Sequence, residues 1–195
     1  MPRLRPYVDG DWEAVLDLCL LAFAPACRSL ERLLGTDLDW KACITRHLRS
    51  LTRPSERRRL VVVERRGSVV GVVHYQVDRA THSGSMGVSA VHPAQQGKGI
   101  GSAMYRHVLA AMAAQGVKYA TADTGADSTY AAARRAYESV GFVSVPTVHY
   151  FMAVGESGAG ASRRSSRPSH HKTRRATGAN ALEAGRLSKI EPRTS

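Results

Sequence analysis

Apolar residues recur along this chain with two periods, one typical of strands and the other of helices. An apolar residue every three to four positions predicts a helix, whereas short β-branched runs between turn residues predict strands. The predicted strands are Leu4–Tyr7, Leu60–Glu64, Val69–Val77, Met86–Val91, Tyr119–Asp123, Phe142–Val145 and Val148–Val154. The predicted helices follow Asp9 or Asp11, cover Leu30–Leu51 with an interruption near Gly35–Leu38, and cover Ala103–Ala114 and Ala131–Val140.

The order of these elements predicts an α+β (mixed α/β) fold. We expect a central mixed sheet of about six to seven strands flanked by about four helices. These elements lie in residues 1–154, which we expect to form one domain. Residues 155–195 contain nine Lys or Arg, three Asp or Glu and few large apolar residues. Such a segment cannot bury enough apolar surface to offset the entropy of ordering, so we expect a disordered basic tail rich in Gly, Ser and Arg.

Composition and charge narrow the class of protein. The net charge is +12, and the basic run 163–175 is either a polyanion contact, for example to nucleic acid, or a solvated extension. The three cysteines, Cys19, Cys27 and Cys43, are typical of a reducing cytoplasm. Because metal-site spacings, a signal peptide and a membrane-spanning run are all missing from the sequence, we expect a cytoplasmic protein with no metal and no membrane contact. The sequence neither indicates nor excludes a homodimer.

The segment Val88–Ser102 holds the most informative local pattern, an apolar strand followed by a glycine-dense turn and a helix start. Free backbone N–H groups and the positive end of the helix dipole make such a turn a phosphate site. The residue after Lys98 is not the Ser or Thr that a P-loop requires. Ser102 replaces the third glycine of a dinucleotide fingerprint, which weakens that alternative, although Asp123 lies near the position of its acidic residue.

The same segment resembles the acetyl-CoA-binding loop of the GNAT family of N-acetyltransferases. The resemblance rests on Ala90-Val91-His92-Pro93 followed by Gln96, Gly99 and Gly101. Ala133-Arg-Arg-Ala-Tyr137-Glu-Ser-Val-Gly-Phe142 is similar to the family's second signature. The element order over residues 3–153 also agrees with the GNAT fold, and the similarity is greatest to bacterial members of undefined substrate.

The resemblance implies an N-acetyltransferase that moves an acetyl group from acetyl-CoA, its co-substrate, to a primary amine of a small molecule or peptide. Tyr137 matches the tyrosine that protonates the departing thiolate in the family. A non-catalytic CoA-binding sensor or interaction protein on the same fold is the alternative. The residues implied in cofactor binding are Ser89, Ala90, Val91, Gln96, Gly97, Lys98, Gly99, Ile100, Gly101 and Ser102.

Two departures from the family pattern bear on the chemistry. Many members carry an acidic residue early in the strand before the loop, whereas this chain has Gly84-Ser85-Met86-Gly87, and Tyr130 stands where asparagine is common. The acetyl transfer requires a general base, because the amine must be neutral to attack and only about 0.1 % of an alkyl amine is neutral at pH 7. Asp123 is the predicted base, and the other candidates are His74, Asp78 and Asp127.

The acceptor is not identified by the sequence. In this family the acceptor cleft usually involves the first two helices and the last strands. The aromatic residues in these elements are candidates either for lining the cleft or for packing in the core. They are Trp12, Phe23, Trp40, His149, Tyr150 and Phe151.

Overall fold

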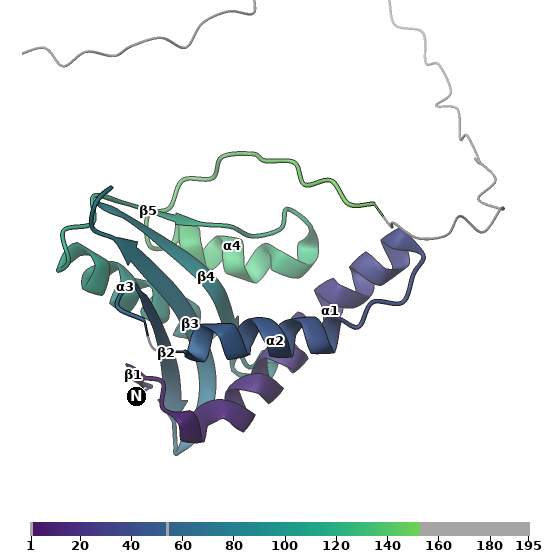
Figure 1. Ribbon diagram of the computed structural model, residues 1–195, viewed down its shortest axis with the longest axis horizontal. Coiled ribbons are helices and arrows are strands. Elements are labelled where there is room, and N and C mark those ends of the chain that lie inside the picture. The colour runs from purple at the N-terminus through teal and green to yellow at the C-terminus, as the bar shows by residue number, and fades with distance from the viewer. Residues whose placement is uncertain (1, 54, 153–195) are drawn as a thin grey trace, which may run out of the picture. The chain divides into compact units, whose positions relative to one another are not determined.

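The computed structural model describes residues 2–53 and 55–152. Five strands form one sheet in the order β1-β2-β3-β4-β5, antiparallel except for the parallel pair β4–β5 (Figure 1). The strands are β1 (Arg3–Pro6), β2 (Arg58–Arg65), β3 (Ser68–Asp78), β4 (Ser83–Val91) and β5 (Tyr119–Ala122). The helices are α1 (Trp12–Leu34), α2 (Trp40–Thr52), α3 (Ile100–Ala113) and α4 (Ala131–Glu138), with short 3-10 turns η1 (Asp9–Asp11), η2 (Pro93–Gln95) and η3 (Ser128–Tyr130).

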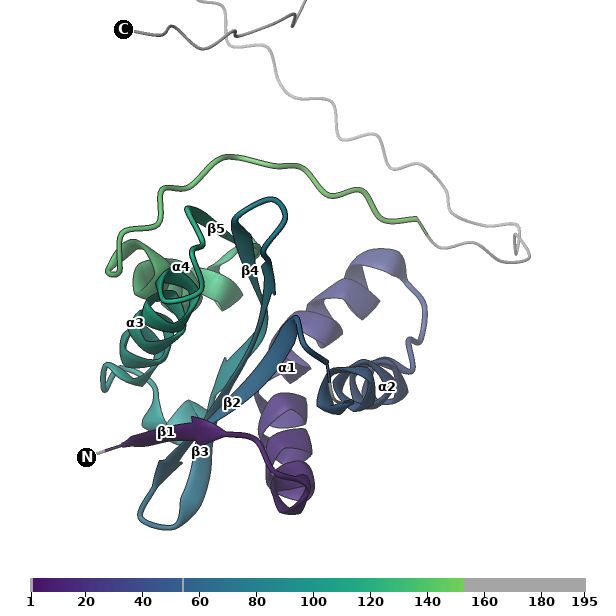
Figure 2. The same ribbon diagram turned by 60° about the vertical axis from the view of Figure 1, so that its left-hand side comes forward.

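Helices cover both faces of the sheet, with α1 and α2 on one side and α3 and α4 on the other (Figure 2). Strand alternation explains the two cores, because successive side chains of β3 point to opposite faces. Val73, Tyr75 and Val77 pack in the core beneath α3, whereas Val72 packs beneath α1 and α2. Each fully buried valine contributes about 1.5 kcal/mol or more. The α+β class expected from the element order is confirmed.

The helix boundaries follow local signals with one exception. Asp39 caps α2 as predicted, because its Oδ1 accepts a hydrogen bond of 3.0 Å from Ala42 N. The interruption predicted near Gly35–Leu38 separates α1 from α2, and Gly35 ends α1 in the left-handed conformation. The N-terminal helix and the segment from Leu30 form one helix instead of two, with Pro25 inside it. Figure 2 shows α1 running in two directions, as expected where proline removes a helical hydrogen bond.

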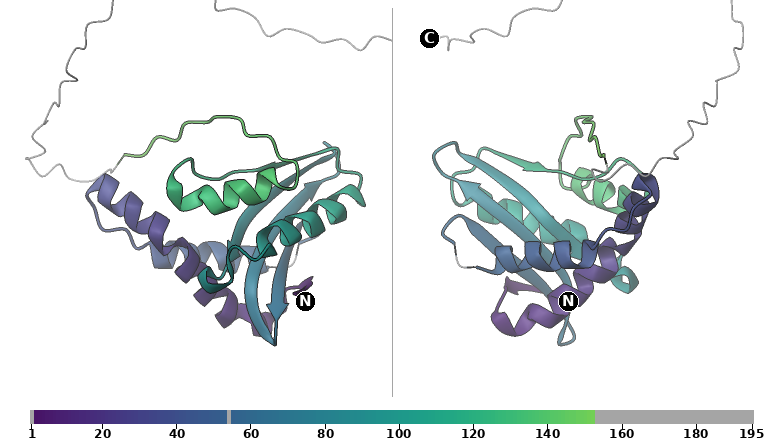
Figure 3. Two further views of the ribbon diagram at one scale, coloured as in Figure 1. Left: turned by 180° about the vertical axis from the view of Figure 1, so that it is seen from behind. Right: turned by 45° about the vertical axis from the view of Figure 1, so that its right-hand side comes forward.

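The two strands predicted after α4 are not formed in the residues that the structure describes. Phe142–Val145 and the following residues to Met152 have no regular structure and run as an extended segment away from the sheet (Figure 3). Val143 is 88 % exposed and Tyr150 91 % exposed. A segment with alternating apolar residues forms a strand only where a neighbouring backbone pairs with it. Among the described strands β5 pairs with β4 alone, so the segment after α4 does not extend the sheet. The sheet therefore has five described strands, fewer than expected. Residues 153–195, including the predicted tail, lie outside the described part.

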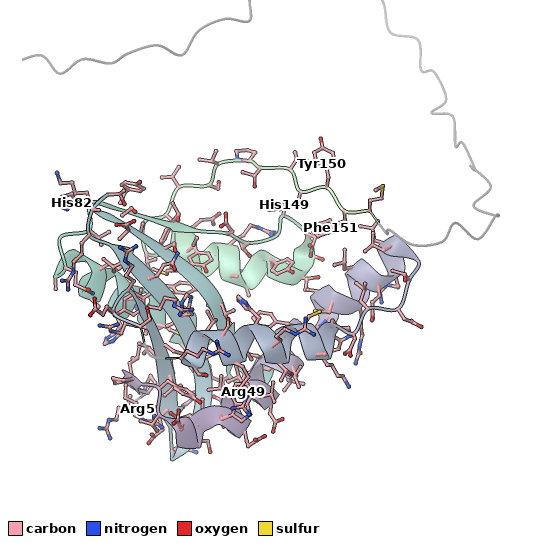
Figure 4. All side chains as sticks on the ribbon, viewed as in Figure 1. Arg5, Arg49, His82, His149, Tyr150 and Phe151 are labelled. Atoms are coloured by element: carbon pink, nitrogen blue, oxygen red, sulfur yellow. The ribbon has the colours of Figure 1, made fainter. Side chains whose placement is uncertain are left out.

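A partly buried ion pair joins β1 to η1, the turn that leads into α1. Asp11 accepts hydrogen bonds from Arg5 Nη1 at 2.7 Å, from Arg5 Nη2 at 2.8 Å and from Val8 N at 2.9 Å. Arg5 also contacts Glu64 of β2 at 3.0 Å and is labelled in Figure 4. The Arg5 guanidinium lowers the pKa of Asp11 below its usual value. The pair therefore stabilises the fold at neutral pH.

Replacing Asp11 by asparagine is expected to lower the free energy of unfolding by about 3 kcal/mol at pH 7, because Arg5 loses its buried partner. The depressed pKa of Asp11 gives stability that is present above about pH 4, its unfolded value, and is lost as pH falls through the folded value. Urea unfolding of both proteins from pH 7 to pH 3 measures this. The difference between them should shrink at low pH, and Glu64→Gln, at the more exposed contact, should cost less. A pH-independent difference would contradict the assignment.

Candidate functional site

The sheet opens between β4 and β5, and this opening forms the candidate site. The two strands pair only from Ser83–Tyr119 to Met86–Ala122, although β4 continues to Val91. The second half of β4 therefore has a free edge on this side. A cavity of about 320 Å³ lies beside this edge. Its walls come from α1, the end of β4, the glycine turn, α3, η3 and α4.

The glycine turn lies at the entrance to α3. Gly97 and Gly99 have φ values of +73° and +74°, a left-handed conformation that side chains other than that of glycine rarely adopt. The first helical hydrogen bond runs from Ala103 N to Gly99 O at 3.0 Å, so the N–H groups of Ile100–Ser102 have no partner within the helix. These groups and the helix dipole can hold a phosphate or pyrophosphate.

The free edge of β4 presents backbone hydrogen-bonding groups to the cavity. His92 N donates to Val70 O at 2.9 Å, so the backbone groups of His92 point toward β3. Because these groups alternate along a strand, the N–H and C=O groups of Ser89 and Val91 point away from β3, to the free edge. Gln96 Nε2 donates to the carbonyl of Val91 at 3.1 Å, which leaves the Val91 N–H directed at the opening. An extended ligand with amide groups can pair with this edge as an added strand.

Three hydroxyl groups meet beside the cavity. The Ser89 hydroxyl lies 2.9 Å from that of Tyr105 on α3 and 3.3 Å from that of Tyr137 on α4. The two tyrosine rings stack with centroids 4.2 Å apart, and Phe142 packs edge-on against Tyr137 at 5.3 Å. Burial and, to a lesser degree, the neighbouring Tyr137 raise the pKa of Tyr105, so Tyr105 stays protonated. The three hydroxyls therefore form a hydrogen-bonded cluster beside the cavity.

The structure brings nearly all of the predicted cofactor-binding residues to one cavity. Lys98 is the exception: its Nζ turns back to Ala94 O at 2.8 Å and Gln95 Oε1 at 3.1 Å, and it is not among the lining residues. Gly101 packs closely against α4, where an added Cβ would lie 3.4 Å from that of Ala136. The predicted residues that line the cavity are Ser89, Ala90, Val91, Gln96, Gly97, Gly99, Ile100, Gly101 and Ser102.

The predicted catalytic residues are placed less uniformly. Tyr137 is 6 % exposed and is not among the lining residues, although its hydroxyl contacts that of Ser89, which lines the cavity. Asp123 is exposed, immediately after β5, and is not among the lining residues. Asp78 accepts hydrogen bonds from Ala80 N and Thr81 N, at 2.9 and 3.4 Å, and so shapes a turn.

Two more of the candidate residues also have structural partners. Asp127 caps η3 by accepting from Thr129 N at 2.8 Å, and this hydrogen bonding lowers the pKa of its carboxyl. Trp12 is buried, with the Arg49 guanidinium 3.5 Å above its ring, so it belongs to the core and not to a cleft. His149, Tyr150 and Phe151 lie on the extended segment after α4, as the labels in Figure 4 show.

Several cavity residues were not predicted from the sequence. Tyr105 lies on α3 at a position typical of a core residue, and only the fold brings it to Ser89. Ala22 and Ala26 of α1 line the cavity together with Phe23, because α1 continues past the length predicted for its first segment. Tyr130, which the sequence singled out where asparagine is common in the family, also lines the cavity and packs against Gly125.

Metal ligation and membrane insertion find no support in the described residues. Within residues 2–53 and 55–152 no three His, Cys, Asp or Glu side chains are grouped so that they could hold a metal ion. None of the helices in this part of the chain has the length and apolarity needed to cross a bilayer.

Comparison with known sequences assigns the fold to a family. The model of the acetyltransferase (GNAT) family matches residues 14–142. That range contains the glycine turn, the free edge of β4, the three hydroxyl groups and every residue that lines the cavity. No curated protein sequence matches the chain significantly.

Solved structures with similar folds include proteins of different stated roles. A transcriptional regulator from Bacillus halodurans superposes with a TM-score of 0.57 at 17 % identity, over 77 % of this chain and 100 % of that one. The ribosomal-protein-S18-alanine N-acetyltransferase from Escherichia coli gives 0.57 at 20 % identity, over 75 % and 80 %. AAC(6')-Iy, in complex with the bisubstrate analogue CoA-S-monomethyl-acetylneamine, gives 0.55 at 12 % identity, over 80 % and 99 %. At these identities the likenesses establish the fold.

Proposed function

Because this chain belongs to the GNAT acetyltransferase family, we propose that it transfers an acetyl group from acetyl-CoA to a primary amine of a small molecule or peptide. The observation that carries the proposal is the opening between β4 and β5. A phosphate-binding turn, a free strand edge and a buried proton donor converge there. These are the three elements that a thioester donor with a pyrophosphate needs.

Acetyl-CoA would bind along β4, from the turn to the hydroxyl cluster. The N–H groups of Gly97–Ser102 hold its pyrophosphate, and the left-handed glycines allow a close approach. The amides of the pantetheine arm pair with the free edge at Ser89–Val91. This arrangement brings the thioester to the hydroxyl cluster.

The chemistry requires an oxyanion donor and an acid. A backbone N–H of the free edge, at Ser89 or Val91, stabilises the oxyanion that forms when the amine attacks the carbonyl. Tyr137 donates a proton to the sulfur as the C–S bond breaks, so that CoA leaves as a thiol. Ser89 holds the Tyr137 hydroxyl at 3.3 Å and so orients it. Asp123, the base predicted from the sequence, is exposed after β5 and is not among the residues that line the cavity.

The amine-dependent release of CoA thiol from acetyl-CoA tests the proposal. A suitable panel is spermidine, kanamycin and a short peptide with a free N-terminal alanine, which cover a polyamine, an amino sugar and a peptide amine. Thiol release that requires both protein and amine, with an acetylated product detected by mass spectrometry, is the expected result. Binding of acetyl-CoA with no release across a broad amine screen would instead favour the CoA sensor.

Replacing Ser89 by alanine is expected to lower kcat about tenfold, because Tyr137 and Tyr105 lose their shared hydrogen-bond partner. A tenfold effect corresponds to about 1.4 kcal/mol, the scale of one hydrogen bond. The Kd of acetyl-CoA should change less than about twofold, since pantetheine pairs with the Ser89 backbone and not with its hydroxyl. Steady-state kinetics and calorimetry measure the two effects. Ser102→Ala removes another lining hydroxyl, which bonds Ser139 at 2.7 Å, and serves as the control with unchanged kcat.

A further inference from the structure

One buried polar side chain lies outside the groups used above. His74 of β3 is 6 % exposed, and its Nε2 is the one buried side-chain N or O atom in the described residues that has no hydrogen-bond partner. Native proteins satisfy nearly all such atoms, and the exceptions are often functional. Burial, assisted by the neighbouring Arg58 on β2 and His47 on α2, lowers the pKa of His74 to about 4. The ring is therefore neutral at physiological pH.

The imidazole faces a β-bulge in β4. Val73 of β3 pairs with Ser89 and Tyr75 pairs with Met86, so the two residues Gly87 and Val88 lie opposite His74. A Cβ added at Gly87 would lie 2.7 Å from His74 Nδ1. The imidazole thus fills the space that any side chain at Gly87 would occupy. Gly87 itself is exposed, so this edge of the ring borders the surface.

This position is close to the reacting atoms of the proposed reaction. Gly87 precedes Ser89 by two residues, about 7 Å along the strand. Ser89 lines the cavity and contacts Tyr137. The segment Gly84–Gly87 is also the part of the strand in which the chain has no carboxylate of its own. Neither His74 nor Gly87 is among the residues that line the cavity, and the imidazole lies beside the segment of β4 that leads into it.

We propose that His74 is the general base of the acyl transfer, an inference that rests on the proposed function. The amine nitrogen attacks the thioester carbonyl carbon and forms the C–N bond, and it loses one proton to His74 Nδ1. The C–S bond then breaks with its electron pair on sulfur, which takes a proton from Tyr137. His74 releases its proton to solvent and Tyr137 regains one, so the net products are an amide and the CoA thiol.

A weakly basic imidazole suits this step. Once bonded to the carbonyl carbon, the nitrogen carries a positive charge and is far more acidic than the free ammonium ion. In the tautomer that accepts a proton at Nδ1, the other proton lies on Nε2, where no acceptor stabilises it. The resulting imidazolium is disfavoured and passes its proton on. Asp78 and Asp127, by contrast, are held by backbone N–H groups.

The test compares variants in the thiol-release assay, with the amine of the panel that wild type turns over fastest. His74→Ala and His74→Gln are expected to lower kcat about 100-fold, with the Kd of acetyl-CoA unchanged. Gln retains most of the volume and cannot accept the proton, so it separates chemistry from packing if the alanine variant folds poorly. The exposed His82→Gln, in the turn between β3 and β4, is the matched control and should retain its rate, whereas Asp123→Asn tests the alternative base.

A rescue experiment excludes a purely structural role. Removing the imidazole frees the space beside Gly87, so the double variant His74→Ala with Gly87→Glu returns a carboxylate to the site. We expect it to recover at least about tenfold over His74→Ala and to show a new acidic limb in its pH–rate profile. Loss of rate in Asp123→Asn with retention in both His74 variants would overturn the inference and leave the proposed function intact. Absence of transfer by wild type would overturn both.

Discussion

Replacing Gly99 by valine is expected to weaken acetyl-CoA binding at least about 100-fold, or about 2.8 kcal/mol. Gly99 has φ +74°, a conformation in which a β-branched residue is strongly disfavoured. The substitution therefore moves the backbone of the turn and misdirects the N–H groups at the start of α3. An added side chain also blocks the close approach of the pyrophosphate. Isothermal titration calorimetry with acetyl-CoA measures the effect.

The chain offers a matched control for backbone strain. Gly67, in the turn between β2 and β3, has φ +77°, and it too has no atom within 4 Å of an added Cβ. Gly67→Val should lower the thermal midpoint by a similar amount without changing the Kd of acetyl-CoA, because the cavity lining does not include this turn. Equal weakening of binding by both variants would mean that global destabilisation, and not the turn, causes the loss.

Replacing Tyr137 by phenylalanine is expected to lower kcat about 100-fold or more, the usual contribution of a positioned acid. The ring would keep its stack on Tyr105 and its edge contact with Phe142, so the cavity should keep its shape. Only the hydroxyl that we propose as the donor to the thiolate is removed. The Kd of acetyl-CoA is therefore expected to stay within about twofold. Steady-state kinetics and calorimetry on the same preparation distinguish the two quantities.

Tyr105→Phe is the control for this effect. Tyr105 is also buried and shares the Ser89 hydroxyl, and unlike Tyr137 it lines the cavity, so it separates a supporting hydrogen bond from the proposed acid. Its loss should lower kcat about tenfold at most, the scale of one supporting hydrogen bond. An equal loss in both variants would show that the cluster acts through packing, and that Tyr137 has no distinct role as acid.

The sequence predicts the site best where local chemistry determines the geometry. Gly97 and Gly99 are needed because the turn has positive φ, and Asp39 caps a helix that begins one residue later. Such requirements are written into a few consecutive residues, so the turn, the strand before it and the helix after it are all recoverable. Tyr137 is found because its segment, Ala133–Phe142, resembles the second signature of the family.

Features that depend on distant partners are not recoverable in this way. Nothing in the neighbourhood of Tyr105 indicates that its hydroxyl will meet Ser89, sixteen residues earlier, on a different element. The segment 142–152 has a strand-like apolar pattern but no regular structure. A strand requires a neighbouring backbone to pair with, and the sequence pattern carries no information about that neighbour. His74 belongs to the same class, because its relation to Gly87 is created by a bulge in the neighbouring strand.

Calorimetric titration of the full chain with acetyl-CoA tests most directly whether the opening between β4 and β5 is an acetyl-CoA site. One molecule per chain is expected to bind with a Kd in the micromolar range, about −8 kcal/mol, and the Gly99→Val variant should lose that binding. Absence of binding at millimolar acetyl-CoA by the folded wild-type chain, or full binding by Gly99→Val, would contradict it.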